Sequence, residues 1–467
     1  MPQARCNALP PEVWHQVISY LSKIDICLCR LISHKFNDMA VNEALAELSI
    51  TIGSRARHGE PAASEFQSAQ EQVARTSSLI DRITHDPTFA SFVRRLVVHF
   101  YGWRQHQMEI LVDALCSLHR LQSFTWFGAR LVPSDNILHA LERGCPSLRV
   151  LSLPLQTYQN RKLSHSILSR LRSISVTPPE FGTTIRTTLT SLSCNTSLES
   201  LCFLRMFYSR PADIPLAHLP NLLELEVAFT DTYDGLGEAV RQAPQLQSLC
   251  LFWITHEVDE VIHEVVAAIS HLPNLAMLAI QHGTTYTPIP AAACAQFCAA
   301  LRGRARLRRL FCNLRIRHDD CAAHLDMLAT LPNLEILALV TEDVLCVEFL
   351  AELQRCLPAQ LSVLMLSHTY ADSHGPQAFL RFWQHFSNLS FLRVEAWAAP
   401  GLTAHDIVHH AGKSLQLVQY RGDVLDVEHW EDGQTMLWPW STQKILLRGI
   451  EDSGCEGWNW YMRHSLA

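Results

Sequence analysis

The sequence predicts an α/β protein in which a short N-terminal helical module precedes a solenoid of strand–helix units, with parallel strands on the concave face and helices on the convex face. Apolar residues recur at helical spacing between positions 11 and 40, and the pattern apolar-x-x-apolar-x-apolar returns repeatedly from residue 93 onward. Apolar residues make up 48% of the chain and charged residues 18%, which indicates a folded protein with a large core.

The N-terminal module is predicted to contain short helices. Residues 9–12, Leu-Pro-Pro-Glu, place prolines and an acid where the first turn of a helix accepts them. The apolar residues that follow at helical spacing are Val13, Val17, Ile18 and Leu21. Asp25 is suited to cap a second helix, which carries Leu28, Leu31, Ile32 and Phe36. Helices this short bury too little surface to be stable alone, so we expect them to pack on the rest of the chain or on another protein.

These residues resemble the F-box, whose helices dock on the Skp adaptor of cullin-RING ubiquitin ligases. The matching positions are Leu9-Pro10, Glu12, Ile18, Leu21, Asp25, Leu28, Arg30, Ile32-Ser33, Lys35-Phe36 and Ala40. The resemblance implies that residues 5–45 bind a Skp-type adaptor, and through it a cullin-RING ligase. The implied adaptor-binding residues are Leu9, Pro10, Glu12, Val13, Val17, Ile18, Leu21, Leu28, Ile32 and Phe36. Many members carry Trp at the position of Phe36 and Val-Cys at Ile32-Ser33. The alternative is that these helices only cap the domain that follows.

The periodic region contains units whose first apolar residues lie 23 to 32 positions apart. These leading residues are Val93, Leu121, Leu148, Leu171, Leu198, Leu222, Leu246, Leu275, Leu307, Leu334, Leu361, Leu389 and Leu415, with a weaker match at Thr442. The tetrapeptide Leu-Pro-Asn-Leu opens three of them, at 219, 272 and 331. The segments between units show helical periodicity. Because one strand and one helix cannot bury their apolar faces alone, the units are predicted to stack around a continuous core.

This pattern resembles the leucine-rich repeat, in its long, helix-backed, ribonuclease-inhibitor-like form, over residues 79–447. The combination with the N-terminal module resembles fungal-type F-box/leucine-rich-repeat proteins. The Asn or Cys that the family carries eight residues after the leading Leu is absent, as at Tyr101 and Ala129. Residues 46–78 are predicted to be a linker or helical joint and residues 448–467 a C-terminal cap or tail. Five of the eleven tryptophans lie in the last 38 residues, which suits a cap better than a ligand-binding cage.

Several classes of function are disfavoured by composition and motifs. Acids outnumber Lys and Arg by 45 to 38, so nucleic-acid binding is not expected, and no apolar run has the length of a membrane span. The fifteen cysteines form no CxxC pair, which favours reduced thiols and a cytoplasmic or nuclear location. His263-Glu264 begins a zinc-protease motif, but Ala267 replaces the second histidine. We therefore expect no catalytic site, metal or cofactor, although groups converging from different repeats stay an alternative.

The strand face is the predicted recognition surface for a protein substrate. Side chains expected there are Arg95, Glu224, Glu226, Phe252, Arg309, Phe311, Asn313, Arg393 and Glu395. Seven arginines fall between residues 302 and 317, which suits an acidic or phosphorylated peptide. The alternative is that most of them are solvated and balance nearby acids, and only Arg309 is expected to point into the groove.

These patterns lead to one main hypothesis and one alternative. The main hypothesis is a non-catalytic substrate-recognition subunit of a Skp-cullin-F-box ubiquitin ligase, which docks the adaptor through residues 5–45 and holds a substrate with the repeat arc. The alternative is a scaffold or ligand-sensing repeat protein with no role in ubiquitination.

Overall fold

The computed structural model divides into two compact units, Met1–Leu198 and Glu199–Ala467. The structure describes positions 14, 18, 26, 29, 214 and the ranges 31–53, 63–100, 105–127, 133–154, 163–177, 195–203, 216–229, 233–253, 258–282, 289–316, 321–341, 347–368, 377–395, 402–430 and 433–440. Among the described helices, none combines the length and the apolar character that crossing a membrane requires.

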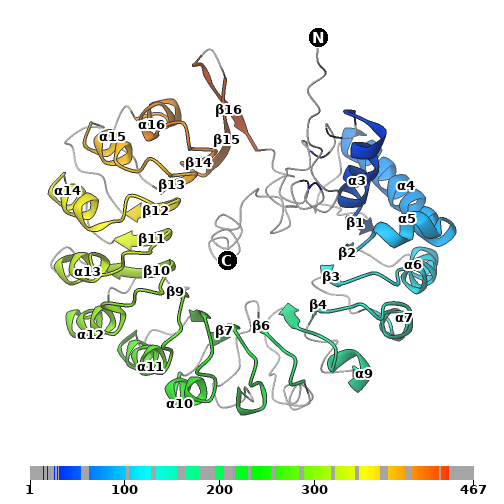
Figure 1. Cartoon of the computed structure of the whole chain (residues 1–467), viewed down its shortest axis with the longest axis horizontal. Helices are drawn as coiled ribbons and strands as arrows, with labels where there is room; N and C mark the ends of the chain where they lie inside the picture. The colour runs from blue at the N-terminus through cyan, green and yellow to red at the C-terminus, as the bar shows by residue number, and fades with distance from the viewer. Residues whose placement is uncertain are drawn as a thin grey trace, which may run out of the picture. The chain divides into compact units, whose positions relative to one another are not determined.

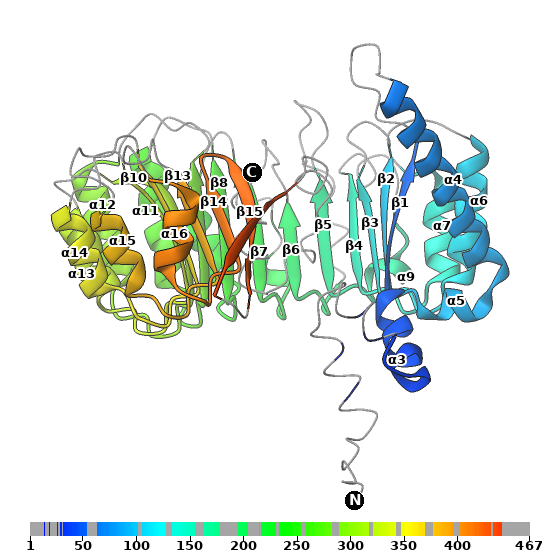
Figure 2. The same cartoon turned by 90° about the horizontal axis from the view of Figure 1, so that it is seen from above.

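The first unit contains five parallel strands and the helices that cover one face of them (Figures 1 and 2). Its elements are α3 (His34–Ala44), β1 (Glu47–Ile52), α4 (Ala63–His85), α5 (Pro87–Phe92), β2 (Arg95–Phe100), α6 (Gln105–Ser117), β3 (Ser123–Phe127), α7 (Asp135–Gly144), β4 (Val150–Pro154), α9 (His165–Leu168) and β5 (Ser173–Thr177). Each strand pairs with its sequence neighbours in the unit. Because neighbouring strands are parallel, the connection after each strand brings the chain back to the edge of the sheet where the next strand begins, as in a solenoid.

The second unit repeats this arrangement and then departs from it at its end. Its strands are β6 (Ser200–Phe203), β7 (Glu224–Phe229), β8 (Ser248–Trp253), β9 (Met277–His282), β10 (Arg309–Ile316), β11 (Ile336–Thr341), β12 (Val363–His368), β13 (Phe391–Glu395), β14 (Leu417–Tyr420), β15 (Asp423–His429) and β16 (Thr435–Pro439). Strands β6 to β14 pair in parallel, whereas β14–β15 and β15–β16 are antiparallel.

Helices cover the convex face of the second unit, and its strands line the concave face (Figure 1). The helices are η3 (Leu216–His218), α10 (Leu236–Arg241), α11 (Val258–Ser270), α12 (Ala291–Leu301), α13 (Cys321–Leu328), α14 (Val347–Cys356), α15 (Gln377–Gln384) and α16 (Ala404–Ala411). Local signals set some of the helix ends: Thr403 and Asp406 form a reciprocal capping box at the start of α16.

The leading residues of the predicted units form the core of both units. Each of the thirteen from Val93 to Leu415 stands two residues before a strand, and each is at most 1% exposed. Within β2, Leu96, Val98 and Phe100 are buried while Arg95 is exposed, which is the alternation that a strand with one covered face requires. The prediction of a strand–helix solenoid is confirmed. Thr442 lies outside the described residues.

The ends of the array differ from the sequence prediction. Residues 46–78, expected to be a linker or joint, contain β1 and most of α4, and β1 pairs with β2 in parallel register from Glu47 opposite Arg95 to Ile52 opposite Phe100. The long connection through α4 separates β1 from β2 by more than one ordinary repeat, so the search for a regular period missed it. At the other end, the β15–β16 hairpin follows the last parallel strand.

Two links between repeats start three residues before a leading residue. Asn195 is fully buried, and its Nδ2 donates to the carbonyl oxygen of Leu171 at 2.9 Å. The Sγ of Cys145 donates to the carbonyl oxygen of Leu115 at 3.4 Å, and burial raises the pKa of this thiol to about 12, which keeps it protonated.

Candidate functional site

The N-terminal module has a small core of its own. Ile18, Ile26, Met39 and Ala40 are buried together, and Trp14, Cys29, Phe36 and Ala44 pack against them. Trp14 meets Phe36 edge-on, with 4.9 Å between ring centroids and an interplanar angle of 70°. Phe36, which replaces the Trp of many F-boxes, therefore contributes an aromatic contact inside the module.

Leu31 and Ile32 stand exposed beside this core, with exposed fractions of 82% and 65%. The amide of Ile32 donates to the carbonyl oxygen of Cys29, and Ser33 caps α3 by accepting a hydrogen bond from the amide of Phe36 at 3.2 Å. These bonds hold the turn on which the two side chains lie. Two adjacent large aliphatic side chains in water form an apolar surface that suits contact with another protein.

The implied adaptor-binding residues differ in burial, and most of them are not described. Ile32 is exposed, Phe36 is half-buried, and Ile18 is 1% exposed and belongs to the core of the module. Leu9, Pro10, Glu12, Val13, Val17, Leu21 and Leu28 lie outside the described residues. Leu31 was assigned only to the apolar stripe of a helix. Its exposure follows from the turn that comes before α3, which the sequence pattern did not reveal.

The face of the first unit opposite its helices carries small polar side chains. One register row across β1–β5 consists of Ser49, Val97, Thr125, Ser152 and Ser175. In the neighbouring row, the side chain of Arg95 is half exposed and its Nη1 lies 3.8 Å from Oε2 of Glu47. The predicted recognition residue Arg95 is thus on an accessible face, with an acid beside it.

An aromatic pair lies at the other end of the same strands. His99 stacks on Phe127 with 5.2 Å between ring centroids, and Phe127 is 42% exposed. Burial lowers the pKa of His99 from its ordinary value, so its imidazole is neutral at pH 7. The first unit therefore offers hydroxyl groups, an ion pair and an exposed aromatic ring on one face.

The corresponding face of the second unit is mostly apolar. Cys250, Ala279, Phe311, Ala338 and Met365 share one register row across β8–β12. They form a buried cluster together with Ile336, Val363, Phe391, Leu417, Val424 and Trp440. Trp440 is 7% exposed, whereas Trp430 and Trp438 are each 48% exposed. The cap prediction concerned five tryptophans, of which Trp458 and Trp460 lie outside the described residues, so the cap stays a prediction.

This burial corrects the expectation that Arg309, Phe311 and Arg393 stand open in a groove. Their exposed fractions are 5%, 4% and 8%. Strand alternation places them on the correct face, where Phe311 belongs to the buried apolar cluster. Their role in substrate binding stays a prediction.

The other predicted recognition residues differ in exposure. Glu224 is exposed, and Glu226 is half-buried and accepts a hydrogen bond from Sγ of Cys202 at 2.9 Å. Phe252 is half-buried. The backbones of Asn313 and Glu395 belong to β10 and β13, while their side chains lie outside what the structure describes.

The arginines between 302 and 317 mainly connect repeats. Arg302 lies 3.7 Å from Asp326, and Nε of Arg308 lies 2.8 Å from Oε1 of Glu335. Arg304 donates to three main-chain carbonyl groups, and Arg306 to the side-chain oxygen of Asn274. The side chain of Arg315 and the whole of Arg317 lie outside the described part of the chain. These contacts favour the alternative in which the arginines do not form one anion-binding strip.

Comparison with known proteins identifies the N-terminal module. A family model of the F-box-like domain matches residues 6–46. A comparison with curated protein sequences finds no match. The chain therefore carries an F-box-like domain, followed by a strand–helix array of the leucine-rich-repeat type.

Two solved structures similar to the chain are repeat proteins or complexes. In the crystal structure of the Rad7 and Elc1 complex in yeast, the match has 13% identity and a TM-score of 0.44 and covers 85% of this chain and 92% of that chain. The leucine-rich repeat-containing protein LegL7 from Legionella pneumophila matches with 14% identity and a TM-score of 0.31, over 70% of this chain and 88% of that chain.

Proposed function

We propose that the protein is the substrate-recognition subunit of a Skp-cullin-F-box-type ubiquitin ligase. The F-box-like domain at residues 6–46 is the observation that carries this proposal. The domain docks on a Skp-type adaptor, and a cullin-RING assembly brings the enzyme that transfers ubiquitin. The chain itself contributes no chemistry, and its effect on rate comes from holding the substrate near that enzyme. We place this function in the cytoplasm or nucleus.

The exposed pair Leu31–Ile32 supports an adaptor contact. The module already has a buried core of its own, so these two side chains are not needed to complete it. Covering both on binding removes apolar surface from water at about 25 cal/mol per Å². We assign this pair to the adaptor interface.

Substrate contacts are assigned first to the strand face of the first unit. Arg95 and Phe127 are exposed there, and hydroxyl groups lie between them in register. In the second unit, the buried cluster with Trp440 occupies much of the corresponding face from β8 to β14. Glu224 and the half-buried Phe252 are the further candidates in that unit.

Coexpression with a Skp-type adaptor tests the proposal. The full chain is expected to copurify with the adaptor, and a variant lacking residues 1–45, or carrying Leu9→Asp and Pro10→Asp, is expected to lose it. Strand β1 begins at Glu47, so the deletion leaves the strand array in place. Circular dichroism on each variant separates a lost interface from a lost fold. Equal copurification of all forms would contradict the proposal and favour the scaffold alternative.

The substrate is identified by affinity capture under proteasome inhibition, with the full chain and with the variant lacking residues 1–45. A protein captured by both forms, but stabilised in cells only by loss of residues 1–45, behaves as a substrate. If no captured protein is stabilised by that deletion, the role in ubiquitination is contradicted while the repeat array keeps its role in binding.

A further inference from the structure

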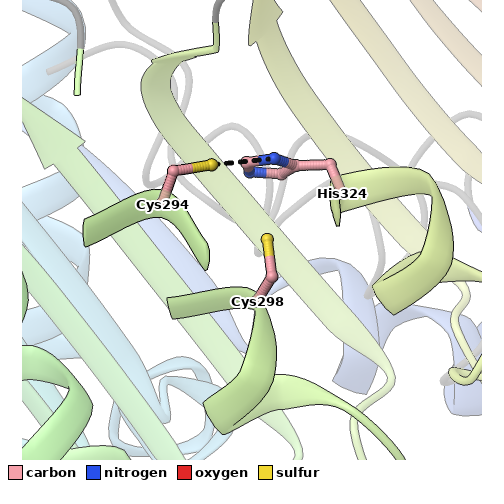
Figure 3. Close-up of side chains that lie close together, drawn as sticks. All are labelled: Cys294, Cys298 and His324. Carbon is pink, nitrogen blue, oxygen red and sulfur yellow. Dashed lines mark hydrogen bonds between the residues drawn. The ribbon is translucent and has the colours of Figure 1, made fainter. Parts of the chain in front are cut away.

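Three potential metal ligands meet between α12 and α13, on the helical side of the second unit (Figure 3). Cys294 and Cys298 are four residues apart on α12 and so lie on one face of that helix. His324 comes from α13 and points toward them. The exposed fractions of the three residues are 2%, 2% and 3%.

Their donor atoms are close together. One ligand atom from each residue lies within 4.8 Å of the other two, and Sγ of Cys294 is 3.3 Å from Nδ1 of His324. Tetrahedral Zn²⁺ has bonds of about 2.3 Å to sulfur and about 2.0 Å to nitrogen, which places neighbouring donors about 3.5 to 3.8 Å apart. Small side-chain rotations therefore suffice to bring the three donors onto one ion.

The imidazole of His324 has an unfulfilled bonding capacity. Its Nε2 is buried and has no hydrogen-bond partner among the described residues. A buried polar atom in this state costs about 1 to 3 kcal/mol, so a native protein usually satisfies it. Coordination through Nε2 would satisfy this atom directly, and coordination through Nδ1 would replace the weak bond to sulfur with a metal bond.

We propose that Cys294, Cys298 and His324 form a binding site for a divalent thiophilic metal ion, with Zn²⁺ as the expected occupant. Two thiolates neutralise the charge of the ion, so the occupied site can be buried without a net charge. Soft sulfur ligands with an imidazole select Zn²⁺ over Mg²⁺ or Ca²⁺, which prefer oxygen. Binding releases the two thiol protons to solvent, and no oxidant or reductant is needed.

The chemistry of the surroundings fits a structural role. A hydrogen bond to Cys294, burial, and the nearby thiols of Cys294 and Cys312 raise the pKa of Cys298, so without a cation this thiol stays neutral. The ion would tie the helices of two successive repeats together, away from the strand face on which we place substrate contacts.

The test measures metal on the purified full chain. After dialysis against metal-free buffer, elemental analysis is expected to find one zinc ion per chain in the unchanged protein. Cys294→Ser, Cys298→Ser and His324→Gln should each lose it, while Cys356→Ser, which removes a thiol from the neighbouring α14, should retain it. Retention of zinc by all three ligand variants would overturn the proposal.

A second measurement uses only the unchanged protein, so it does not require the ligand variants to fold. Zinc is removed from the unchanged protein with a chelator and Co²⁺ is added as the probe. A tetrahedral thiolate site gives intense d–d bands and a sulfur-to-cobalt charge-transfer band, and re-addition of Zn²⁺ should abolish both. Absence of these bands, together with a melting temperature that Zn²⁺ does not raise, would show that the three side chains only pack against each other.

Discussion

The guanidinium group of Arg304 donates a hydrogen bond from Nη1 to the carbonyl oxygen of Leu272, at 2.6 Å, and so joins two successive repeats. Its Nη2 bonds to Ile269 at 2.7 Å and its Nε to Ala300 at 2.8 Å, both at main-chain carbonyl oxygens. One side chain thus satisfies carbonyl groups in the last turns of α11 and α12 and just beyond α11. Arg304, which lies in an arginine-rich segment that could have been entirely solvated, therefore contributes to the stacking of the repeats.

Replacement of Arg304 by Ala is expected to destabilise the second unit by about 2 kcal/mol, because three charge-assisted hydrogen bonds in a half-buried site are lost. The matched control is Arg306→Ala, whose side chain is exposed and bonds to Asn274. Urea denaturation followed by circular dichroism measures both. Equal midpoints for the two variants would contradict the structural role of Arg304.

Asn195→Ala is expected to lower the stability of the first unit by about 2 kcal/mol. The change removes the bond to the carbonyl oxygen of Leu171 and the bond that the amide of Ser197 donates to Oδ1 at 2.9 Å, in a fully buried site. Asn388→Ala, at an exposed position, is the control and should stay within about 0.5 kcal/mol. Thermal melting distinguishes the two variants, and a larger effect at Asn388 would contradict the assignment.

Gly144→Ala is expected to be destabilising because the helices approach closely there. A Cβ at this position would lie 2.6 Å from the Cα of Cys116 and 2.6 Å from the carbonyl oxygen of Leu115. Backbone at the end of α6 would have to move, at a cost of about 1 to 3 kcal/mol or more. Gly303→Ala meets no atom within 4 Å but has a φ of +73°, so about 1 kcal/mol of backbone strain is expected. Equal stability of the Gly144 variant and the unchanged protein would contradict this packing.

The stability of the first unit is expected to fall in mild acid partly because of His99. Burial lowers its pKa from 6.5, so the folded state binds fewer protons than the unfolded state as the pH falls below that value. The contribution of neutral His99 is therefore complete above the unfolded pKa and decreases below it. Urea titrations at about pH 7.5 and about pH 5 span the pKa of an unfolded histidine, which is about 6.5. Between these two pH values, the free energy of unfolding of His99→Gln should fall less than that of the unchanged protein. Parallel pH profiles would contradict the direction of this shift.

The repeating core was predictable because it depends on local spacing. The leading residues from Val93 to Leu415 recur 23 to 32 positions apart, and each is buried two residues before a strand. Strand β1 was missed because α4 lengthens its connection to β2. The hairpin after β14 was missed because its strands lack the leading-residue pattern and pair in the opposite direction.

The exposure of candidate site residues was less predictable than their position. Alternation placed Arg309 and Arg393 on the strand face, but it did not reveal that both are buried there, with exposed fractions of 5% and 8%. The group formed by Cys294, Cys298 and His324 was also only partly predictable. The four-residue spacing of the two cysteines places them on one face of a helix, whereas His324 lies beside them only because α13 packs next to α12.

Binding of the full chain to a purified Skp-type adaptor, measured by isothermal titration calorimetry, decides whether the F-box-like domain acts as a docking module. Ile32→Glu and Leu31→Glu each place a charge where an apolar contact is proposed, and the exposed positions predict little loss of fold. Each is expected to weaken binding about 30-fold, or about 2 kcal/mol, while Trp430→Glu, at another exposed apolar position, leaves it unchanged. No binding by the unchanged protein, or equal affinities for all four chains, would contradict the proposed function.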